Sequence, residues 1–162
     1  MTDCKPCATP TASGFCLTDD GEVFPNPSLY RTLIGSLKYL TYMRPNLAFV
    51  VNCLSQFLTA PKLQHWTACK RLLRYLKGTL GYGLFFSPSP GDLTLLVYAD
   101  ANHAGCKITR RSTSGLCVYL GSNLIVWSSR KQSVVAGSVG EAEYRGIAQG
   151  VTELLWLKSL FT

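Results

Sequence analysis

The sequence contains no hydrophobic run close to the roughly 20 residues that a membrane-spanning helix needs. Its N-terminus also lacks the charged and apolar regions of a secretory signal peptide. We therefore expect a soluble intracellular protein with no membrane partner, in a compartment that the sequence does not specify. With 162 residues and 47% hydrophobic content, the chain is large enough to form a packed core.

Disulfide and metal-binding patterns are equally scarce. The seven cysteines are odd in number and scattered, which indicates free thiols in a reducing compartment rather than a disulfide framework. Cys4 and Cys7 form one Cys-x-x-Cys motif with no second pair, so we expect no zinc site there. His65 and His103 are isolated, and each is predicted to be a packed or surface residue rather than a metal ligand.

Acidic residues are few, and they are missing from the middle of the chain. The sequence has 16 Lys and Arg against nine Asp and Glu, a formal net charge of +7, and residues 28–80 hold eight Lys and Arg but no acid. A central block of one sign favours contact with a polyanion such as DNA or an RNA–DNA hybrid. The alternative is a basic surface that only confers solubility.

Apolar spacing predicts helices through this basic block. Ser28 is a candidate N-cap for a first amphipathic helix that extends to Leu40, Pro45 opens a second apolar stripe up to Pro61, and a third helix covers residues 62–77. Residues 1–27, rich in Pro, Thr, Asp and Gly, are predicted to form an extended or loosely ordered segment, which we call the lead-in. Trp66, on the third apolar stripe, is predicted to lie in the core.

After residue 80 the period changes to that of strands. Residues 82–86 and 93–100 are rich in β-formers on either side of a predicted turn at 87–91, and residues 116–120 and 124–127 have a hairpin signature. Residues 138–141 have capping-box spacing and open a helix. We predict that the core face of this helix consists of Ile147, Val151, Leu154, Leu155 and Trp156, and that Trp127 is also in the core.

These patterns define the predicted organisation. The lead-in covers residues 1–27, a helical segment covers residues 28–80, and a βββα unit covers residues 81–162. The predicted fold class is therefore α+β to α/β.

Two carboxylates in the βββα unit are candidates for catalysis. Asp100 follows an apolar strand and Glu143 lies one turn into the last helix, whereas Glu141 is on a different helix face. Two acids brought together repel each other, and a divalent cation removes that cost by coordination. A pair of such ions roughly 3.5–4 Å apart can activate water against a phosphodiester. From spacing alone, a strand-end polar residue and helix-dipole partners are the competing interpretation.

Two basic groups are candidates for nucleic-acid binding. The third helix carries a positive ridge, which we call the basic face, composed of Lys70, Arg71, Arg74 and Lys77. Such a surface can contact phosphates in a salt-dependent manner, but a solvated helix face is equally compatible. Arg110 and Arg111, followed by hydroxyl residues, could hold a phosphate or form a polar turn.

The chain resembles the Pol polyproteins of copia-type retrotransposons. The motifs that carry this resemblance follow one another in the same order as in the family, over nearly the whole chain. The reverse transcriptase-like motifs lie at residues 30–41, 44–48, 65–66 and 70–79, and the ribonuclease H-like motifs lie at residues 98–105, 110–115, 127–132 and 141–144. The resemblance implies a thumb or connection-like helical segment followed by an incomplete ribonuclease H-like domain whose sheet would be mixed. It also implies that Asp100 and Glu143 would bind Mg²⁺ for cleavage of RNA in an RNA–DNA hybrid.

The chain departs from the family pattern near this implied site. Asn102 and His103 stand where the family has an acid and an aromatic residue, and Val139-Gly140 replace Ser-Thr before the Glu-Ala-Glu motif. The family's third metal-binding aspartate would follow on a later strand beside the first one, and its polymerase palm would lie upstream.

We therefore expect a fragment or degenerate remnant that is not a competent nuclease alone. A non-catalytic nucleic-acid-binding module is the alternative, and a partner-dependent interaction protein is another. Because the later strand would cover the strand that ends at Asp100, an open sheet edge would also favour self-association.

Overall fold

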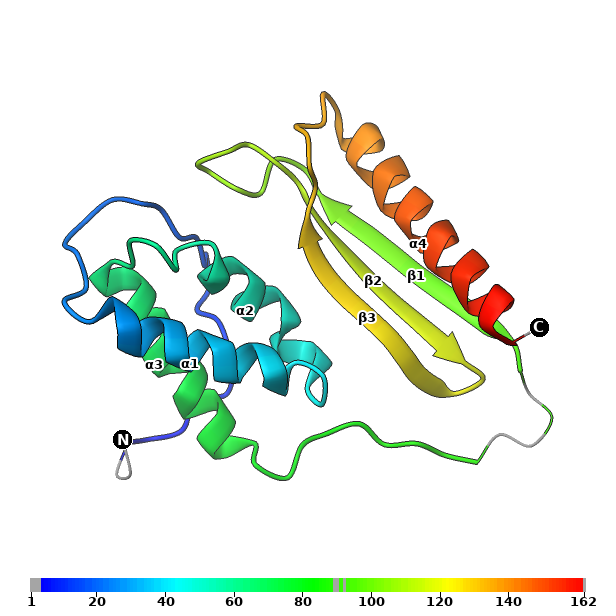
Figure 1. Ribbon diagram of the computed structural model, residues 1–162, viewed down its shortest axis with the longest axis horizontal. Coiled ribbons are helices and arrows are strands. Elements are labelled where there is room, and N and C mark those ends of the chain that lie inside the picture. Colours follow the sequence, from blue (N-terminus) through cyan, green and yellow to red (C-terminus); the bar gives the residue numbers. More distant parts are fainter. Residues whose placement is uncertain (1–3, 89–90, 92, 162) are drawn as a thin grey trace. The chain divides into compact units, whose positions relative to one another are not determined.

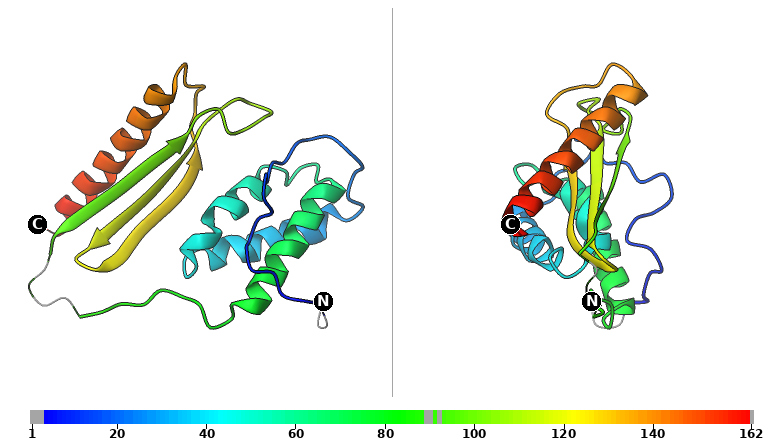
Figure 2. Two further views of the ribbon diagram at one scale, coloured as in Figure 1. Left: turned by 180° about the vertical axis from the view of Figure 1, so that it is seen from behind. Right: turned by 90° about the vertical axis from the view of Figure 1, so that its right-hand side faces the viewer.

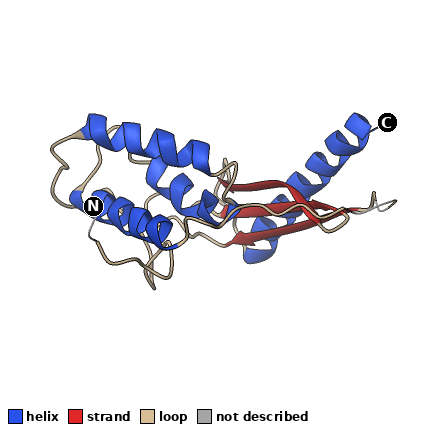
Figure 3. Cartoon of the chain, turned by 90° about the horizontal axis from the view of Figure 1, so that it is seen from below, coloured by secondary structure: helices blue, strands red, loops and turns tan. Residues whose placement is uncertain are grey.

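A computed structural model describes residues 4–88, 91 and 93–161 of the chain. It divides into two compact units, residues 1–83 and 84–162. The boundary falls three residues after the end of the predicted helical segment. The first unit is built of helices and loops, and the second holds the strands (Figure 3). Among the described residues, no helix is long and apolar enough to span a bilayer.

In its described residues, the first unit contains three α-helices and one short 3₁₀ helix (Figure 1). The α-helices are α1 (Pro27–Leu40), α2 (Ala48–Ser55) and α3 (Leu63–Gly78), and the 3₁₀ helix is η1 (Pro45–Leu47). The predicted second stripe is thus split between η1 and α2. The N-cap of α1 is Asn26 and not Ser28, because the Asn26 Oδ1 atom accepts a hydrogen bond from the Leu29 N–H at 2.9 Å. Pro27 then takes the first helical position, where a missing N–H costs nothing.

One apolar core joins the three helices. Its fully buried side chains include Tyr30, Ile34, Leu47, Leu54 and Leu72. The Tyr30 hydroxyl donates to the Leu54 carbonyl at 2.8 Å, which ties α1 to α2. The predicted second stripe is buried, but the predicted stripe of α1 is offset from the core, since Leu29 is 47% exposed and Leu33 is only partly buried. The spacing thus predicted the helix α1 but not the face that it buries.

The lead-in is more firmly held than the sequence predicted. Residues 4–26 contain no helix, and one isolated bridge pairs Val23 with Lys62, yet apolar side chains of the lead-in pack against the core. The Phe24 ring stacks on Trp66 with ring centroids 4.6 Å apart, and the Phe24 N–H donates to the Pro61 carbonyl at 2.8 Å. A few apolar anchors thus fix a segment whose composition favoured loose order.

The second unit is a three-stranded antiparallel sheet covered by one helix. Strands β1 (Leu95–Asn102), β2 (Thr113–Leu120) and β3 (Asn123–Lys131) pair in the order β1-β2-β3, and α4 (Val139–Phe161) lies along the sheet beside β1 (Figures 1 and 2). The predicted hairpin is confirmed, since β2 and β3 are joined by Gly121 and Ser122, with Gly121 at φ 55°. β1 is an edge strand within the described residues.

The predicted strand at residues 82–86 is wrong. This segment is irregular, and Phe85 is 85% exposed, because no described strand pairs with it. Ser87 instead exchanges two hydrogen bonds with the Asn123 side chain, at 2.8 and 2.9 Å. The predicted turn includes residues 89 and 90, which lie outside the described part of the chain.

The predicted core face of α4 is also largely wrong. The residues that α4 buries are small ones and one leucine: Ala142, Gly146, Gly150 and Leu157. A Cβ atom on Gly150 would stand 3.2 Å from Val97 Cγ2, so the helix approaches β1 closely through its glycines. Of the predicted face, Leu154 packs against the core, whereas the others are exposed: Ile147, Val151, Leu155 and Trp156.

Candidate functional site

Asp100 lies near the end of β1, as predicted, with its side chain exposed. Its neighbours Ala99 and Ala101 face α4, as shown by their contacts with Gly150 and Gly146. Because side chains alternate along a strand, the Asp100 carboxylate belongs to the opposite face of the sheet, together with Tyr98. Asp100 is therefore accessible, but it is not on the face that packs against α4.

Glu143 lies in the first turns of α4 and is also exposed. The helix start around it has the predicted cap: the Ser138 Oγ atom accepts from the Glu141 N–H at 3.1 Å, and Glu141 Oε2 accepts from the Gly137 N–H at 2.7 Å. Glu141 also pairs with Arg145 at 2.8 Å. Hydrogen bonds from Gly137 and then Arg145 lower the pKa of Glu141 below its usual range. Glu141 is thus a capping residue, which leaves Glu143 as the free acid of the motif.

The two candidate acids do not form a metal cluster with further ligands. Among residues 4–88, 91 and 93–161, no three His, Cys, Asp or Glu side chains lie close enough together to hold an ion. Asn102 instead has a structural role, since its Oδ1 atom accepts from the Thr113 N–H at 2.8 Å. A Cβ on Gly105 would collide with this Asn102 side chain, so the loop after β1 closes tightly over it. His103 is exposed, as predicted for a surface histidine.

The hydroxyls after Arg110 and Arg111 are used inside the fold, so the predicted phosphate grip is incomplete. Ser112 is fully buried, and its Oγ atom accepts from the Ala104 N–H at 3.1 Å. Ser114 Oγ accepts from Gln132 Nε2 at 3.0 Å. Both arginines are exposed, and Arg110 has a positive φ of 56°, as in a turn. Their contact with a phosphate stays a prediction.

No sequence pattern predicted the contacts of Gln132, although this residue ends the ribonuclease H-like motif at residues 127–132. Its Nε2 atom donates both to Ser114 Oγ and to the Ala142 carbonyl, at 3.0 and 2.9 Å. It therefore joins the end of β3 to β2 and to the first turn of α4. Side-chain amides that bridge elements leave no periodic signal in a sequence.

Three of the four residues of the basic face donate hydrogen bonds to the lead-in. Arg71 Nη2 donates to Thr9 Oγ1 at 2.8 Å, Arg74 Nε donates to the Lys5 carbonyl at 2.6 Å, and Lys77 Nζ donates to the Cys4 carbonyl at 3.0 Å. These three cations attach residues 4–9 of the lead-in to α3. Lys70, the fourth residue of the basic face, is exposed.

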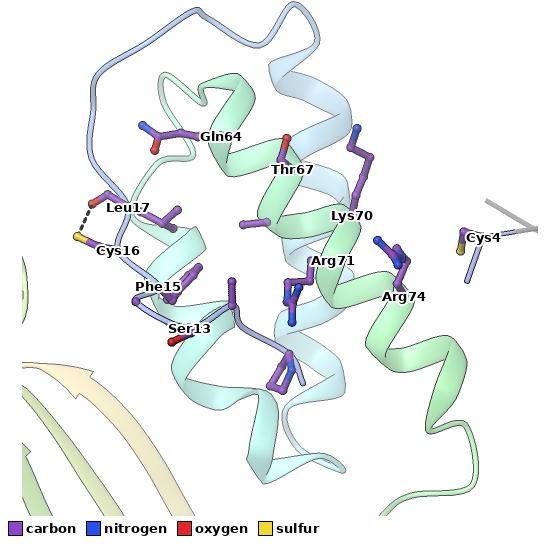
Figure 4. Close-up of a pocket in the computed structure, with 14 residues that line it drawn as sticks. Cys4, Ser13, Phe15, Cys16, Leu17, Gln64, Thr67, Lys70, Arg71 and Arg74 are labelled. Atoms are coloured by element: carbon purple, nitrogen blue, oxygen red, sulfur yellow. Dashed lines mark hydrogen bonds between the residues drawn. The ribbon is translucent and has the colours of Figure 1, made fainter. Parts of the chain in front are cut away.

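Between the lead-in and α3 the structure contains a cavity of about 680 Å³, which we call the cationic cavity. Its basic lining residues are Lys70, Arg71 and Arg74, and no acidic residue lines it among the described residues. Figure 4 shows these side chains projecting from α3, with Phe15 and Leu17 of the lead-in on the other side. The Cys-x-x-Cys motif contributes only Cys4 to this wall.

Of the remaining predictions for tryptophan and histidine residues, some are confirmed and one is wrong. His65 is fully buried, as predicted for a packed histidine, and it stacks on Phe57 with ring centroids 3.8 Å apart. Trp66 packs against the core, and Trp127 is half-buried. Trp156 is 57% exposed, so the prediction of a core position is wrong.

Sequence comparisons with known proteins place this chain in a class of transposon proteins. The chain is 46% identical to the retrovirus-related Pol polyprotein from transposon RE2 of Arabidopsis thaliana, over 100% of this chain and 11% of that protein. It is 36% identical to the Pol polyprotein from transposon TNT 1-94 of Nicotiana tabacum, over 98% of this chain and 12% of that protein.

The chain belongs to the family of Pol polyproteins from copia-type retrotransposons. It spans about a tenth of the length of these curated relatives. It is also 43% identical to the secreted RxLR effector protein 161 of Plasmopara viticola, over 79% of this chain and 90% of that protein. No protein-family profile matches the chain, and no solved structure matches it.

Proposed function

We propose that this chain is a nucleic-acid-contacting segment from the reverse transcriptase and ribonuclease H region of a copia-type Pol polyprotein. The parent protein would synthesise DNA on an RNA template and hydrolyse RNA in RNA–DNA hybrids with Mg²⁺. The observation that carries this proposal is the match of the whole chain to about a tenth of each Pol polyprotein.

We further propose that the chain alone does not cleave a hybrid. Mg²⁺ favours octahedral sites with one or two carboxylates, waters and substrate phosphates. Asp100 and Glu143 supply two exposed acids, but Asp100 lies on the sheet face opposite α4. A two-ion site needs more oxygen ligands than these, so the described residues do not fit such a site.

Binding without cleavage is supported by the charge distribution. The first unit carries the basic face, and its residues 28–80 contain no Asp or Glu. Phosphate contacts by Lys and Arg release counterions, so binding falls steeply as salt rises. Lys70 is the basic-face residue most available for such a contact, because the other three already donate to the lead-in.

Fluorescence titration of a labelled RNA–DNA hybrid over a series of salt concentrations tests this function. We expect affinity to fall with added salt, and Lys70→Ala to weaken binding and to reduce the logarithmic salt slope by about one. Lys38→Ala is the matched control, because Lys38 is an exposed cation at the end of α1 and lies outside the basic face. A salt-independent affinity, or equal effects of the two variants, would contradict the proposal.

A further inference from the structure

The cationic cavity combines two kinds of wall. Three cationic side chains come from little more than one turn of α3, because residues 70 to 74 span about 6 Å along the helix axis. The lead-in and α3 supply apolar lining at Pro10, Phe15, Leu17 and Ala68. A ligand that fills this space must therefore offer both negative charge and an apolar surface.

The charge in the cavity is only partly satisfied by the protein. Arg71 Nη2 and Arg74 Nε donate to the lead-in, but the buried Arg71 Nε atom has no hydrogen-bond partner. A buried donor without an acceptor is unfavourable, and a phosphate bound to the same guanidinium group would supply acceptors that the protein lacks. With no acid in the lining, these groups form a site for an anion that comes from outside.

The dimensions decide between possible anions. An inorganic phosphate ion would leave most of the 680 Å³ and all of the apolar lining unused. A duplex backbone can reach the exposed Lys70, but Arg71 and Arg74 already donate to the lead-in, so a duplex leaves the interior of the cavity empty. A nucleotide has the required combination, since its phosphate is anionic and its base has two apolar faces.

We infer that the cationic cavity binds a single 5′-phosphorylated nucleotide, with the phosphate at Lys70, Arg71 and Arg74 and the base against the apolar wall. The nucleotide is either free or the 5′ end of a single strand. This inference deepens the proposed function and rests on it, because it names the part of a nucleic acid that the first unit holds.

The test uses the full chain and fluorescence anisotropy of a 3′-labelled oligothymidylate, with and without a 5′-phosphate. We expect the phosphorylated strand to bind about tenfold more tightly, which is the effect of one additional charge-assisted contact. Unlabelled thymidine monophosphate as competitor distinguishes the sources: competition indicates a site for free nucleotides, and its absence indicates a strand end. Inorganic phosphate at equal concentration should compete at least tenfold more weakly.

Two variants that fill the cavity from opposite walls distinguish binding inside the cavity from attraction of the nucleic acid by the positive charge of the protein. Thr67→Trp and Ser13→Trp place a large side chain at exposed lining positions without changing the net charge. Both should abolish the preference for the 5′-phosphate, while the hybrid affinity of the basic protein is retained. Thr32→Trp on the exposed side of α1 is the control, and thermal melting verifies that all three variants fold.

Several results would overturn the inference while leaving the proposed function intact. One is an unchanged 5′-phosphate preference in both tryptophan variants. Another is equal competition by inorganic phosphate or by an acidic peptide, which would show attraction by charge alone. Loss of all nucleic-acid binding in the unmodified chain would instead refute the proposed function itself.

Discussion

His65 fixes the start of α3 through both ring nitrogens. Its Nδ1 atom accepts from the Lys62 N–H at 2.9 Å, so Nε2 carries the proton and donates to the Thr18 carbonyl at 2.8 Å. The neutral ring is thus required by its partners. Burial is the largest cause that lowers the pKa of His65 below its ordinary value of 6.5. The hydrogen bond to the Thr18 carbonyl opposes this change, and the charge of Lys62 adds to it.

This arrangement predicts a pH-dependent stability. Because the pKa of His65 is lower in the folded than in the unfolded state, the unfolded state binds more protons at acidic pH. The contribution of His65 is therefore complete above pH 6.5 and is lost as the pH falls through the lowered pKa of the folded state. Urea unfolding of the native chain and of His65→Gln from pH 8 to pH 5 measures it. A free-energy difference between the two proteins that is constant over this range would contradict the assignment.

Arg44 is a buried cation that joins the loop after α1 to the end of α3. It is 5% exposed, Nη1 donates to the Thr79 carbonyl at 2.9 Å, and Nη2 donates to Thr79 Oγ1 at 2.8 Å. Its guanidinium carbon also lies 5.8 and 5.7 Å from the ring centroids of Tyr75 and Tyr82. The carbonyl of Thr79 is at a helix C-terminus, where a positive charge is favourable.

We expect Arg44→Met to lower the free energy of unfolding by about 2–3 kcal/mol, because the two charge-assisted hydrogen bonds to Thr79 and a longer one to Asn46 are lost and a buried carbonyl is left unpaired. Arg44→Lys should recover part of this loss, since a single ammonium cannot reproduce the planar fork. Arg31→Met, on the exposed side of α1, should change the stability by less than about 0.5 kcal/mol. Denaturant titration decides, and equal effects at the two arginines would refute the structural role.

Cys106 is the residue in the second unit with the most unusual thiol. Burial raises its pKa, but hydrogen bonds from Lys131 and Thr109 more than offset this and lower it to about 7. The Lys131 Nζ atom lies 3.0 Å from the sulfur. Alkylation of Cys106 by iodoacetamide, followed by mass spectrometry, should therefore have its midpoint near pH 7.

Lys131→Met should move that midpoint toward 9, because the thiolate loses its nearest cation. Lys107→Met is the control, since it removes a neighbouring exposed charge and leaves Lys131 in place. If both variants shift the profile equally, the Lys131 hydrogen bond is not the cause.

At the scale of elements, β1 and α4 share an exposed apolar edge. β1 has β2 on one side, and on the other a cavity of about 300 Å³ is lined by Val97, Tyr98, Ala99, Ile147 and Val151. An uncovered edge strand with apolar neighbours is a template for pairing with another chain. This edge is the surface at which self-association is predicted.

We expect sedimentation velocity to show association that increases with protein concentration. Leu96→Lys, at an exposed position within β1, should reduce it, because a lysine on an edge strand opposes pairing. Leu93→Lys introduces the same charge at an exposed residue before the strand and should have little effect. A sample that stays monomeric at all concentrations would refute the prediction.

The same elements show where sequence patterns succeed and where they fail. The spacing of Leu33 and Leu37 predicted α1 because a helix that packs on other helices needs an apolar stripe. In α4 the larger side chains, Ile147 and Val151, suggested the wrong face, since the sheet is approached through Gly146 and Gly150. Residues 82–86 have strand composition, but a strand also needs a partner, which composition does not supply.

For the candidate site, the sequence indicated which residues are candidates, but it did not indicate which residues contact one another. The sequence identified Asp100, Glu143 and the basic face of α3, and the structure shows the first two exposed on β1 and α4. It did not reveal that Lys77 and Arg74 are held by lead-in carbonyls, because such contacts join residues about 70 positions apart. The cationic cavity arises from the same long-range packing.

At the scale of the whole molecule, the chain consists of a helical unit that carries the basic face and a second unit formed by a sheet and the helix α4. In the proposed function the first unit contacts the nucleic acid and the second carries only two acids of a metal-dependent nuclease. Whether the second unit keeps any nuclease activity therefore decides between a binding segment and an enzyme.

The most direct measurement is cleavage of a 5′-labelled RNA–DNA hybrid by the purified chain in Mg²⁺, beside the Asp100→Asn and Glu143→Gln variants. We predict that the hybrid is bound and stays intact, with no difference in cleavage among the three proteins, because two exposed carboxylates do not complete a two-ion site. Cleavage that requires Mg²⁺ and disappears in Asp100→Asn would contradict the account.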